Sequence, residues 1–481
     1  MSLFKKKVVT RFAPSPTGYS HIGGLRTALY AYLYARQNKG DFLLRIEDTD
    51  RSRYVAGAIE DIIEVLENLG IKPDNELYRQ SDHLDIYKNK AEELVKQDQA
   101  YYCFCSAERL IKLREEQVAK KQPPGYDGRC RSLSAEQVEN YLRINKSHVI
   151  RFKTPHHQIV EFNDVVHGPV KINTENIDDQ VLIKSDGYPT YHLAVVIDDH
   201  KMGITHVIRG EEWLPSTPKH VLLYQAFSWP LPSYVHLPLL LNKDRSKLSK
   251  RTGDVAAKDY LEKGYLPTAI INFIALLGWN PGTDKEVFSL AELLKEFSLK
   301  KINKSGAIFD ITKLNWFNQT YLQQLDQQSF YQLSQAWLAN HEPNLVADYN
   351  QVVARASQTR ISNFSEIPEI FSHIFVDEFT YPTQELIFKK SDKISTTKGL
   401  TTATAVLEKI ANDDWTVSKL ELVLNNLVIE QQLGNGDVFW PIRYALSGKT
   451  KSESPVELLT ELGKDKSLLR INKAISLLKK I

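Results

Sequence analysis

A glycine-bearing loop between a predicted strand and a predicted helix constrains the fold of this chain more than any other feature. The loop covers residues 13–24, APSPTGYSHIGG, and follows a strand pattern at residues 8–12. Beyond it, apolar residues repeat at helical spacing: Leu25, Ala28, Leu29, Tyr32 and Leu33. Because glycine weakens a helix, Gly23 and Gly24 at its start indicate a close approach of the backbone to another group.

The start of this predicted helix suits a bound triphosphate. A loop that enters a helix presents free backbone N–H groups and the positive end of the helix dipole. His21 lies in the same turn, where its imidazole can donate to phosphate oxygens. We therefore expect Gly18, His21, Gly23 and Gly24 to contact a nucleotide.

A short basic segment much later in the chain is the second informative feature. Residues 247–251 read KLSKR. Alone, a run of this composition is more typical of a solvated charge cluster. Paired with the first loop, it predicts a segment that closes on phosphate, with Lys247 and Lys250 as point charges and Ser249 between them.

The two segments resemble the signature motifs of the class I aminoacyl-tRNA synthetases, and residues 11–18, RFAPSPTG, are similar to the glutamyl branch of that family. The similarity continues through three further segments: RIEDTD at 45–50, SDGYPTY at 185–191 and HVIRGEEW at 206–213. Gly24 replaces the closing His of the general class pattern, and Leu248 and Arg251 replace a Met and a Ser. The glutamyl branch commonly varies at these places.

Size and composition limit the number of domains and the functional classes that this chain can have. A chain of 481 residues suggests about two to four domains, and 42% hydrophobic with 25% charged residues is typical of a globular enzyme. A net charge of +2 falls short of a dedicated nucleic-acid binder, so any RNA-binding residues must be arranged locally. The sequence contains neither a long apolar run nor an N-terminal apolar signal, which predicts a cytoplasmic protein without a membrane partner.

Alternating patterns predict an α/β fold with a Rossmann-like parallel sheet. Strands are expected at 8–13, 42–46, 194–197, 206–208 and 234–241, with helices at 23–36 and 55–69. The sequence pattern changes after Tyr87, where short predicted strands, three cysteines and a proline pair suggest an inserted α+β domain. We expect a catalytic domain formed by 1–86 and 193–241, split by an insertion at 87–192.

The rest of the chain is predicted to be helical. Helical patterns cover 267–277, 290–296, 329–340, 350–362, 417–432 and 471–480. By resemblance, the insertion binds the acceptor end of a tRNA, residues 242–326 form a connector domain that carries the KLSKR segment, and residues 327–481 form an anticodon-binding domain. The periodicity itself supports helices only.

The resemblance also implies an amino-acid site, carried over to matching positions: Arg11, Ser15, Glu47, Tyr191 and Arg209. An acidic substrate needs a cation in its pocket, and an Arg fork meets a carboxylate through two hydrogen bonds. Glu47 would then bind the α-ammonium group. Taken alone, the charges at 45–50 could equally form surface pairs at a strand end.

Glu212 and Trp213 are candidates for the adenine or ribose site, although a tryptophan there could equally pack in the core. Arg360, in the sequence SQTRI, occupies a position where the family can place an arginine that reads the third anticodon base. A lone arginine on a helical pattern is more often simply solvated.

Three cysteines invite a zinc interpretation. Cys103, Cys105 and Cys130 supply three thiolates, whereas a structural zinc site needs four ligands. Some relatives complete such a site with a tyrosine four residues before the last cysteine, where this chain has Tyr126; His156 and His157 are more distant candidates. Three reduced, partly buried thiols are an equal alternative.

The resemblance implies an ATP-dependent ligase that activates L-glutamate with Mg²⁺ and ATP and transfers it to the 3′ end of tRNA(Glu), acting as a monomer. A non-discriminating form would also charge tRNA(Gln). A small-molecule nucleotidylyltransferase would have little use for the long helical region, and a silent tRNA-binding paralogue would have lost the cations at 21, 247 and 250. Relatives that glutamylate a modified tRNA base end soon after the second signature.

Overall fold

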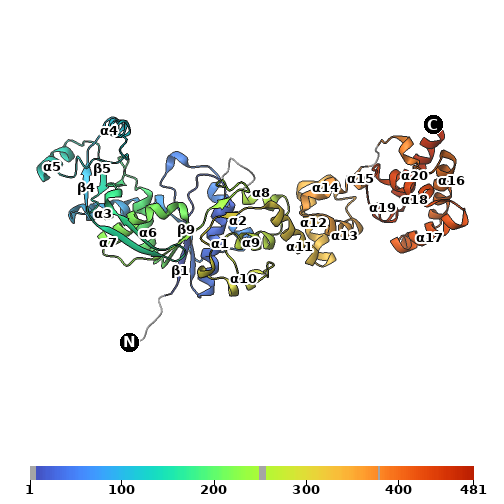
Figure 1. The fold of residues 1–481 in the computed structure, drawn as a ribbon, viewed down its shortest axis with the longest axis horizontal. Coiled ribbons are helices and arrows are strands. Elements are labelled where there is room, and N and C mark those ends of the chain that lie inside the picture. Colours follow the sequence, from blue (N-terminus) through green and yellow to red (C-terminus); the bar gives the residue numbers. More distant parts are fainter. Residues whose placement is uncertain (1–6, 249–255, 377–379) are drawn as a thin grey trace. The chain divides into compact units, whose positions relative to one another are not determined.

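The computed structural model describes residues 7–248, 256–376 and 380–481. The chain divides into two compact units, one formed by residues 1–262 and 266–317, the other by 263–265 and 318–481. Figure 1 labels the elements of both. Each unit is described separately below.

The first unit is built around strands that carry the predicted site. Strands β1 (Val9–Phe12), β2 (Asp41–Ile46) and β3 (Tyr78–Arg79) pair in parallel. Next to β1 lies β9 (His206–Gly210), and Thr205 donates its backbone N–H to Val9 O at 2.9 Å. From β9 the sheet continues in the order β10 (Ser233–Leu237), β6 (Ile159–Asp164) and β7 (Gly168–Asn173), of which only the β6–β7 pair is antiparallel.

Helix α1 (Ile22–Gln37) packs against β1 and β2, as Figure 1 shows. Its inner face is fully buried through residues such as Leu25, Ala28 and Leu29, as the helical spacing predicts. Helix α2 (Ala58–Asn68) lies within residues 55–69, which the sequence predicts to be helical. Strand, glycine-bearing loop and helix therefore follow one another as the sequence indicates.

A small antiparallel sheet lies within the predicted insertion. It contains β4 (Ala100–Cys103), β5 (Val149–Phe152) and β8 (Val181–Ile183). The flanking helices are α3 (Leu84–Lys96), α4 (Ala107–Ala119) and α5 (Ala135–Arg143). By contrast, β6 of the same stretch pairs with β10 through Tyr234 and Asp164, so a hairpin from residues 159–173 extends the sheet of the nucleotide fold.

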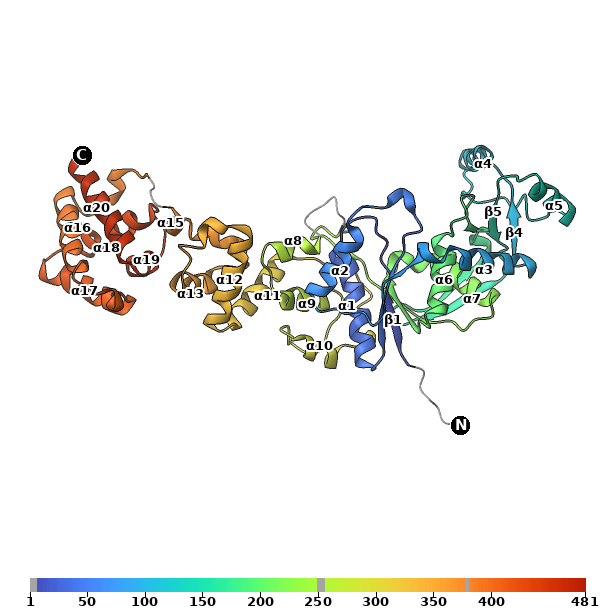
Figure 2. The same ribbon diagram turned by 180° about the vertical axis from the view of Figure 1, so that it is seen from behind.

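The predicted strand at 194–197 is wrong. These residues lie in helix α6 (Tyr191–Lys201), which packs beside α7 (Thr217–Ala226) in one apolar core; Figure 2 shows both helices from behind. Every residue from Leu193 to Asp199 is buried. Because the helix is enclosed on all sides, its apolar run shows no 3.6-residue period and cannot be told from a buried strand.

The remaining elements of this unit follow the sheet. Short strands β11 (Leu240–Leu241) and β12 (Ala307–Ile308) pair in parallel. The helices are α8 (Ala257–Glu262), α9 (Pro267–Ala275), α10 (Leu290–Glu296) and the first part of α11 (Ile311–Gln324). Short 3₁₀ helices occur at Arg51–Arg53, Gln80–His83, Thr174–Asn176, Glu211–Ser216 and Leu299–Lys301.

The described part of the second unit is helical. Its helices are α12 (Gln327–His341), α13 (Gln351–Arg360), α14 (Ile367–Ile370), α15 (Ser372–Phe375), α16 (Lys393–Leu407), α17 (Val417–Glu430), α18 (Asn435–Ser447), α19 (Pro455–Leu462) and α20 (Lys464–Lys480). Short 3₁₀ helices lie at Pro343–Leu345, Phe364–Glu366, Thr383–Leu386 and Asn412–Asp414.

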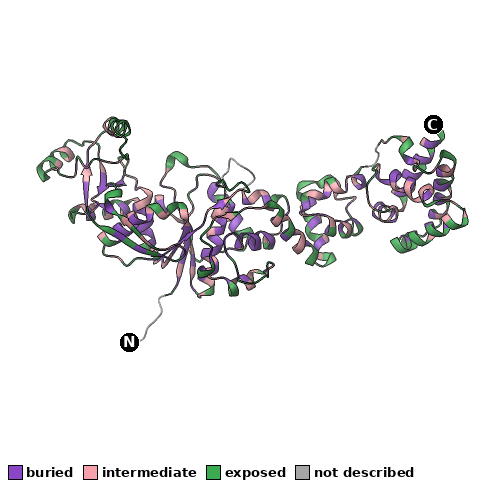
Figure 3. Ribbon diagram, in the orientation of Figure 1, coloured by how far each residue is buried: buried purple, intermediate pink, exposed green. Residues whose placement is uncertain are grey.

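Local signals explain several of these helix boundaries. Helix α19 begins with a capping box, in which Ser454 and Glu457 satisfy each other's backbone N–H groups, and Pro455 occupies its first turn. Figure 3 shows the buried faces of the helices turned inward within each unit. Among the described residues, no helix combines the length and the apolar character needed to cross a bilayer.

Candidate active site

The predicted site residues meet at one cavity in the first unit. This cavity, of about 410 Å³, opens where β1, β2 and β9 end and α1 begins. Ligands of open α/β sheets bind at this edge. The predicted residues that line it are Arg11, Ser15, His21, Gly23, Gly24, Glu47, Tyr191, Arg209, Glu212, Trp213 and Lys247. Gly18 lines an adjoining cavity of about 680 Å³ that shares His21, Gly24, Glu47 and Tyr191.

His21 is the N-cap of α1. Its Nδ1 accepts a hydrogen bond from Gly24 N at 3.0 Å, which places the proton of the neutral imidazole on Nε2. A Cβ atom added at Gly23 would lie 3.1 Å from His21 Nδ1, so a larger residue there would shift the imidazole by a few tenths of an ångström. Gly23 thus leaves room for this position of the histidine.

Lys247 lies on the wall of the same cavity. It bridges to Leu241, and Leu248 N donates to Leu240 O at 2.9 Å, so this part of the KLSKR segment is attached to β11. Further along, Ala256 bridges to His21. Ser249, Lys250 and Arg251 lie outside the described residues.

Arg11 and Glu47 belong to a buried ion network. Arg11 Nε is 3.0 Å from Asp199 Oδ1, and Arg11 Nη1 donates to Ile208 O at 3.1 Å. Arg45 joins the two acids, because its guanidinium lies 2.8 Å from Asp199 and 3.0 Å from Glu47. Arg45 is 0% exposed, so residues 45–47 do not form the surface pairs considered as an alternative.

The arginines of this network favour the ionised forms of its acids, whereas burial opposes them. Burial raises the pKa of Glu47, although the neighbouring Arg45 and Arg11 oppose the rise. Burial also disfavours ionisation of Asp199, but Arg11 and Arg45 hold its pKa below the ordinary value. Asp199 lies in α6, and the assignment of residues 194–197, just before it, to a strand concealed its contribution.

Arg209 is held by a second network, in which its direct hydrogen-bond partners are neutral. Its Nε donates to His236 Nε2 at 3.0 Å, and its Nη2 donates to Thr217 Oγ1 at 2.8 Å. Its Nη1 lies 3.3 Å from Tyr191 Oη and 3.2 Å from His220 Nδ1. Hydrogen bonds therefore orient all three nitrogen atoms of the guanidinium.

The contacts assign the tautomer of His236. Because Arg209 can only donate, His236 Nε2 accepts, and the ring proton is on Nδ1. Nδ1 is 2.7 Å from Asp164 Oδ2, to which it donates. Burial lowers the pKa of His236, which favours this neutral form. Asp164 itself is 1% exposed and lies at the end of β6.

Two further histidines extend this network. His220 Nδ1 accepts from Arg209, so its Nε2–H donates to His192 Nδ1 at 3.0 Å. Burial lowers the pKa of His192 to about 4, with Lys219 and Arg209 adding repulsion, and burial places the pKa of His220 well below its ordinary range. Both rings are therefore neutral at pH 7.

Glu212 and Trp213 line the cavity, and the Trp213 ring lies 4.4 Å from that of Tyr191. Trp213 is 36% exposed, so it does not pack in the core. The residues that sequence reasoning did not single out are Asp164, Thr217, His220, His236 and Asp199. No local motif marks them, because topology alone brings them to Arg209 and Arg11.

The three cysteines lie together with Tyr126. Cys105 Sγ is 3.5 Å from Cys130 Sγ, and Tyr126 Oη is 3.3 Å from Cys103 Sγ. These spacings suit four ligands of one tetrahedral zinc ion. Without metal, burial raises the pKa of the Cys105 thiol to about 11. His157 instead contacts Glu175, at 2.8 Å.

Arg360 lies at the end of α13 and contacts acids. Its Nη1 is 2.7 Å from Glu453 and 3.4 Å from Glu461, and its Nη2 is 3.8 Å from Glu457. The arginine side chain is 28% exposed. It is therefore not the simply solvated residue considered as an alternative.

Comparison with known proteins agrees with this geometry. Residues 7–316 match the family model described as tRNA synthetases class I (E and Q), catalytic domain, and residues 290–475 match an anticodon binding domain. A glutamate–tRNA ligase from Clostridium novyi is 46% identical, with 98% of this chain and 99% of that protein covered. One from Clostridium tetani is 43% identical, with 98% of each chain covered.

Solved structures give the same result. The glutamate tRNA ligase of Elizabethkingia meningosepticum, crystallised in complex with its amino acid, superposes with a TM-score of 0.88 at 38% identity, covering 98% of this chain and 100% of that one. The glutamate–tRNA synthetase of Elizabethkingia anophelis gives a TM-score of 0.83, with the same identity and coverage. The chain therefore belongs to the class I tRNA synthetases of the E and Q group.

Proposed function

We propose that this chain is a glutamate–tRNA ligase, which forms glutamyl-adenylate from L-glutamate and ATP and transfers the glutamyl group to tRNA(Glu). The observation that carries the proposal is the environment of Arg209. Its partners are Tyr191, Thr217, His236 and His220, all neutral. Among the described residues, no carboxylate lies within ion-pair distance of it.

A buried cation without a counter-ion is costly, so this arrangement suits a ligand that brings a carboxylate. The guanidinium of Arg209 is 5% exposed and already oriented, and the Nη2 N–H that is not bonded to Thr217 can donate to the side-chain carboxylate of glutamate. Arg11 differs, because Asp199 already neutralises it. Glu47 is then the acid available for the α-ammonium group, with hydroxyls of Ser15 and Tyr191 on the same wall.

ATP is proposed to bind at the start of α1. The backbone N–H groups there and the imidazole of His21 face the cavity that Lys247 lines. Ser249 and Lys250 would complete the phosphate contacts. Glu212 and Trp213 would contact the adenine or ribose, and Gly18, which lines the adjoining cavity, would also contact the nucleotide. ATP would enter as its Mg²⁺ complex.

The chemistry needs no general base, because a carboxylate is already a nucleophile at neutral pH. An α-carboxylate oxygen of glutamate attacks the α-phosphorus, the bond to the bridging oxygen breaks, and pyrophosphate leaves. The Nε2–H of His21 and the ammonium groups of Lys247 and Lys250 stabilise the charge that develops on the phosphate oxygens. The terminal ribose 2′-hydroxyl of the tRNA then attacks the activated carbonyl, and AMP leaves.

The tRNA is proposed to contact both units. We assign the acceptor end to the insertion at 87–192, the stem to the connector at 242–326 and the anticodon to 327–481. The match of residues 290–475 to an anticodon binding domain supports the last of these assignments. Arg360 would meet the third anticodon base with the exposed part of its guanidinium. We expect the enzyme to act as a cytoplasmic monomer.

A zinc ion is proposed as a structural component of the insertion. The donor set of Cys103, Cys105, Cys130 and Tyr126 supports this, because the thiol groups converge and the Cys130 backbone N–H donates to Tyr126 Oη at 2.9 Å, which fixes the phenol beside them. Co²⁺-substituted protein should show a thiolate charge-transfer absorption that Cys105→Ser loses. Zinc-free protein with an unchanged melting temperature would refute this assignment.

Aminoacylation with radiolabelled glutamate on purified tRNA(Glu) and tRNA(Gln) tests the function. We expect charging of tRNA(Glu), with a loss of at least 100-fold in kcat/KM in Arg209→Gln and in Lys250→Ala. Lys243→Ala is the matched control, because Lys243 is exposed and pairs with Asp310. Charging of tRNA(Gln) as well would identify a non-discriminating enzyme. Incorporation of another amino acid in preference to glutamate would refute the proposal.

A further inference from the structure

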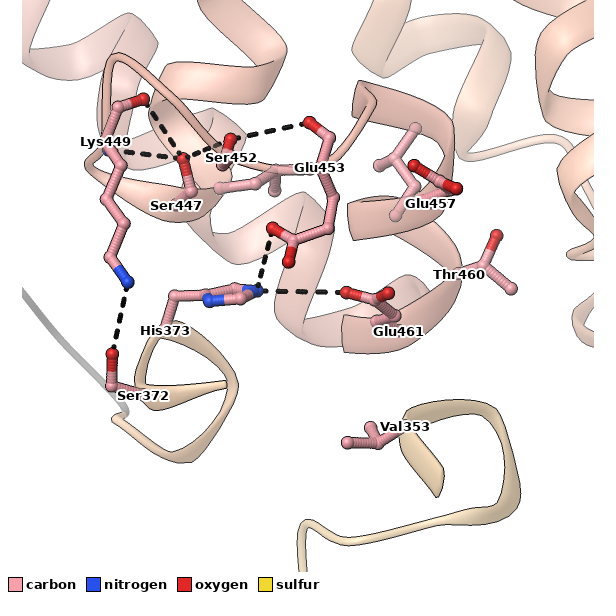
Figure 4. Close-up of polar contacts among 12 residues, drawn as sticks. Val353, Ser372, His373, Ser447, Lys449, Ser452, Glu453, Glu457, Thr460 and Glu461 are labelled. Carbon is pink, nitrogen blue, oxygen red and sulfur yellow. Dashed lines mark hydrogen bonds and ion pairs between the residues drawn. The ribbon is translucent and has the colours of Figure 1, made fainter. Parts of the chain in front are cut away.

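A histidine and two glutamates converge in the second unit, far along the chain from the proposed active site. His373 comes from α15, Glu453 from the segment before α19, and Glu461 from the last turn of α19. Figure 4 shows the His373 ring directed at both carboxylates. Their ligand atoms lie within 4.8 Å of one another.

The polar atoms at this place are buried and lack hydrogen-bond partners. The side chain of His373 is 1% exposed and that of Glu461 is 3% exposed. Among the described residues, neither His373 Nδ1, His373 Nε2 nor Glu461 Oε2 has a hydrogen-bond partner. Buried polar atoms without partners are rare in folded proteins, and an ion is one of the few explanations for several of them in one place.

The distances distinguish a metal site from a hydrogen-bonded pair. His373 Nε2 is 3.8 Å from Glu453 Oε2 and 3.8 Å from Glu461 Oε2. This separation is too long for a hydrogen bond. Two ligands that each lie about 2.0–2.2 Å from one zinc ion are roughly 3.3–3.8 Å apart at tetrahedral to trigonal angles.

Arg360 prepares the carboxylates for a metal. Its Nη1 contacts the Oε1 atoms of Glu453 and Glu461, which leaves both Oε2 atoms directed at His373. Such outer contacts commonly fix the orientation of metal-binding carboxylates. The carboxylates of Glu453 and Glu461 and the guanidinium of Arg360 together leave one negative charge, which favours a cation beside the two Oε2 atoms.

We propose that His373, Glu453 and Glu461 bind a divalent first-row transition metal ion, with zinc as the best match to one imidazole and two carboxylate oxygens. Water would occupy the open position. The ion would join α15 to α19, whose ligands are 80 or more residues apart in sequence, and so would stabilise the helical unit.

The test uses the full chain carrying Cys105→Ser, which removes the proposed thiolate site. Metal-free protein is titrated with Zn²⁺ by calorimetry and with Co²⁺ by absorption spectroscopy. We expect one Zn²⁺ per chain, a rise in melting temperature of several degrees, and visible Co²⁺ ligand-field bands without the thiolate charge-transfer absorption of a cysteine site.

Glu461→Gln should lower the Zn²⁺ affinity at least 100-fold, while the amide can still accept from Arg360. Glu457→Gln is the matched control, since Glu457 contacts Arg360 but not His373, and it should keep the site. Circular dichroism confirms that each variant is folded, and Glu453→Gln replaces Glu461→Gln if the latter unfolds. The absence of Zn²⁺ binding in the Cys105→Ser protein, or binding that Glu461→Gln and Glu453→Gln leave unchanged, would overturn the proposal.

Discussion

Replacement of Asp164 by asparagine should weaken glutamate binding, although Asp164 touches neither the cavity nor Arg209. Asp164 Oδ2 accepts from His236 Nδ1, so His236 Nε2 is free to accept from Arg209 Nε. In Asp164→Asn, the amide nitrogen placed at the Oδ2 position would itself donate. His236 would then carry its proton on Nε2, facing the N–H of Arg209, and the hydrogen bond to Arg209 would be lost.

The size of this effect follows from the contacts. A hydrogen bond to a charged group contributes about 1.5–3 kcal/mol, which corresponds to roughly 10- to 150-fold in affinity. Thr217 and Tyr191 still hold the Nη atoms of Arg209, so the guanidinium is tilted rather than released. We therefore expect the lower part of this range, a rise of about 10- to 30-fold in the KM for glutamate.

The assay is aminoacylation of tRNA(Glu) with glutamate and ATP varied separately. The KM for ATP should stay within about twofold of the parent value, because His21 and Lys247 are untouched. Glu161→Gln is the matched control on the same strand, since Glu161 is exposed and pairs with Lys171 at 3.1 Å. Equal changes in both KM values, or an unchanged KM for glutamate in folded Asp164→Asn, would show that the network does not position Arg209.

Three other perturbations test separate parts of the structure. Gly23→Ala should raise the KM for ATP about tenfold, because its Cβ would displace His21; steady-state kinetics that leave this KM unchanged would contradict the contact. Burial lowers the pKa of His192 to about 4, so the folded state excludes a proton that the unfolded chain accepts below about pH 6.5. The melting temperature should therefore fall as the pH is lowered from 6.5 to 4, and this fall should be less steep in His192→Asn. Arg360→Gln should lower the melting temperature of the metal-free chain by several degrees, because Glu461 would lose its cation; an equal melting temperature would refute this.

The sequence predicts the parts of the site that are local. The loop at 13–24 connects a strand to a helix over a few residues, so its glycines and His21 could be placed from spacing alone. Arg11 and Glu47, which lie at or just beyond the ends of two parallel strands, were assigned through the resemblance to a known family. The convergence of Lys247 on this edge depended on the resemblance to a known family.

The surroundings of Arg209 could not be predicted in the same way. Asp164 comes from a hairpin that the texture of the sequence assigns to the insertion, yet β6 pairs with β10 and brings the carboxylate to His236. His220 lies in a helix whose apolar surroundings give no sign of a polar contact. Asp199 was obscured when the fully buried run before it was assigned to a strand.

The two arginines of the cavity show why a carboxylate-binding site needs buried neutral partners. A carboxylate at ion-pair distance from Arg209 would stabilise the guanidinium but would also compete with the substrate, as Asp199 does at Arg11. Histidines with ordinary pKa values would instead add positive charge as the pH fell and would make the fold less stable. Burial holds His220 and His236 in the neutral form, so they orient Arg209 without neutralising it. Glutamine, which lacks the negative charge, would leave this cation unpaired, and the same network should therefore favour glutamate over glutamine.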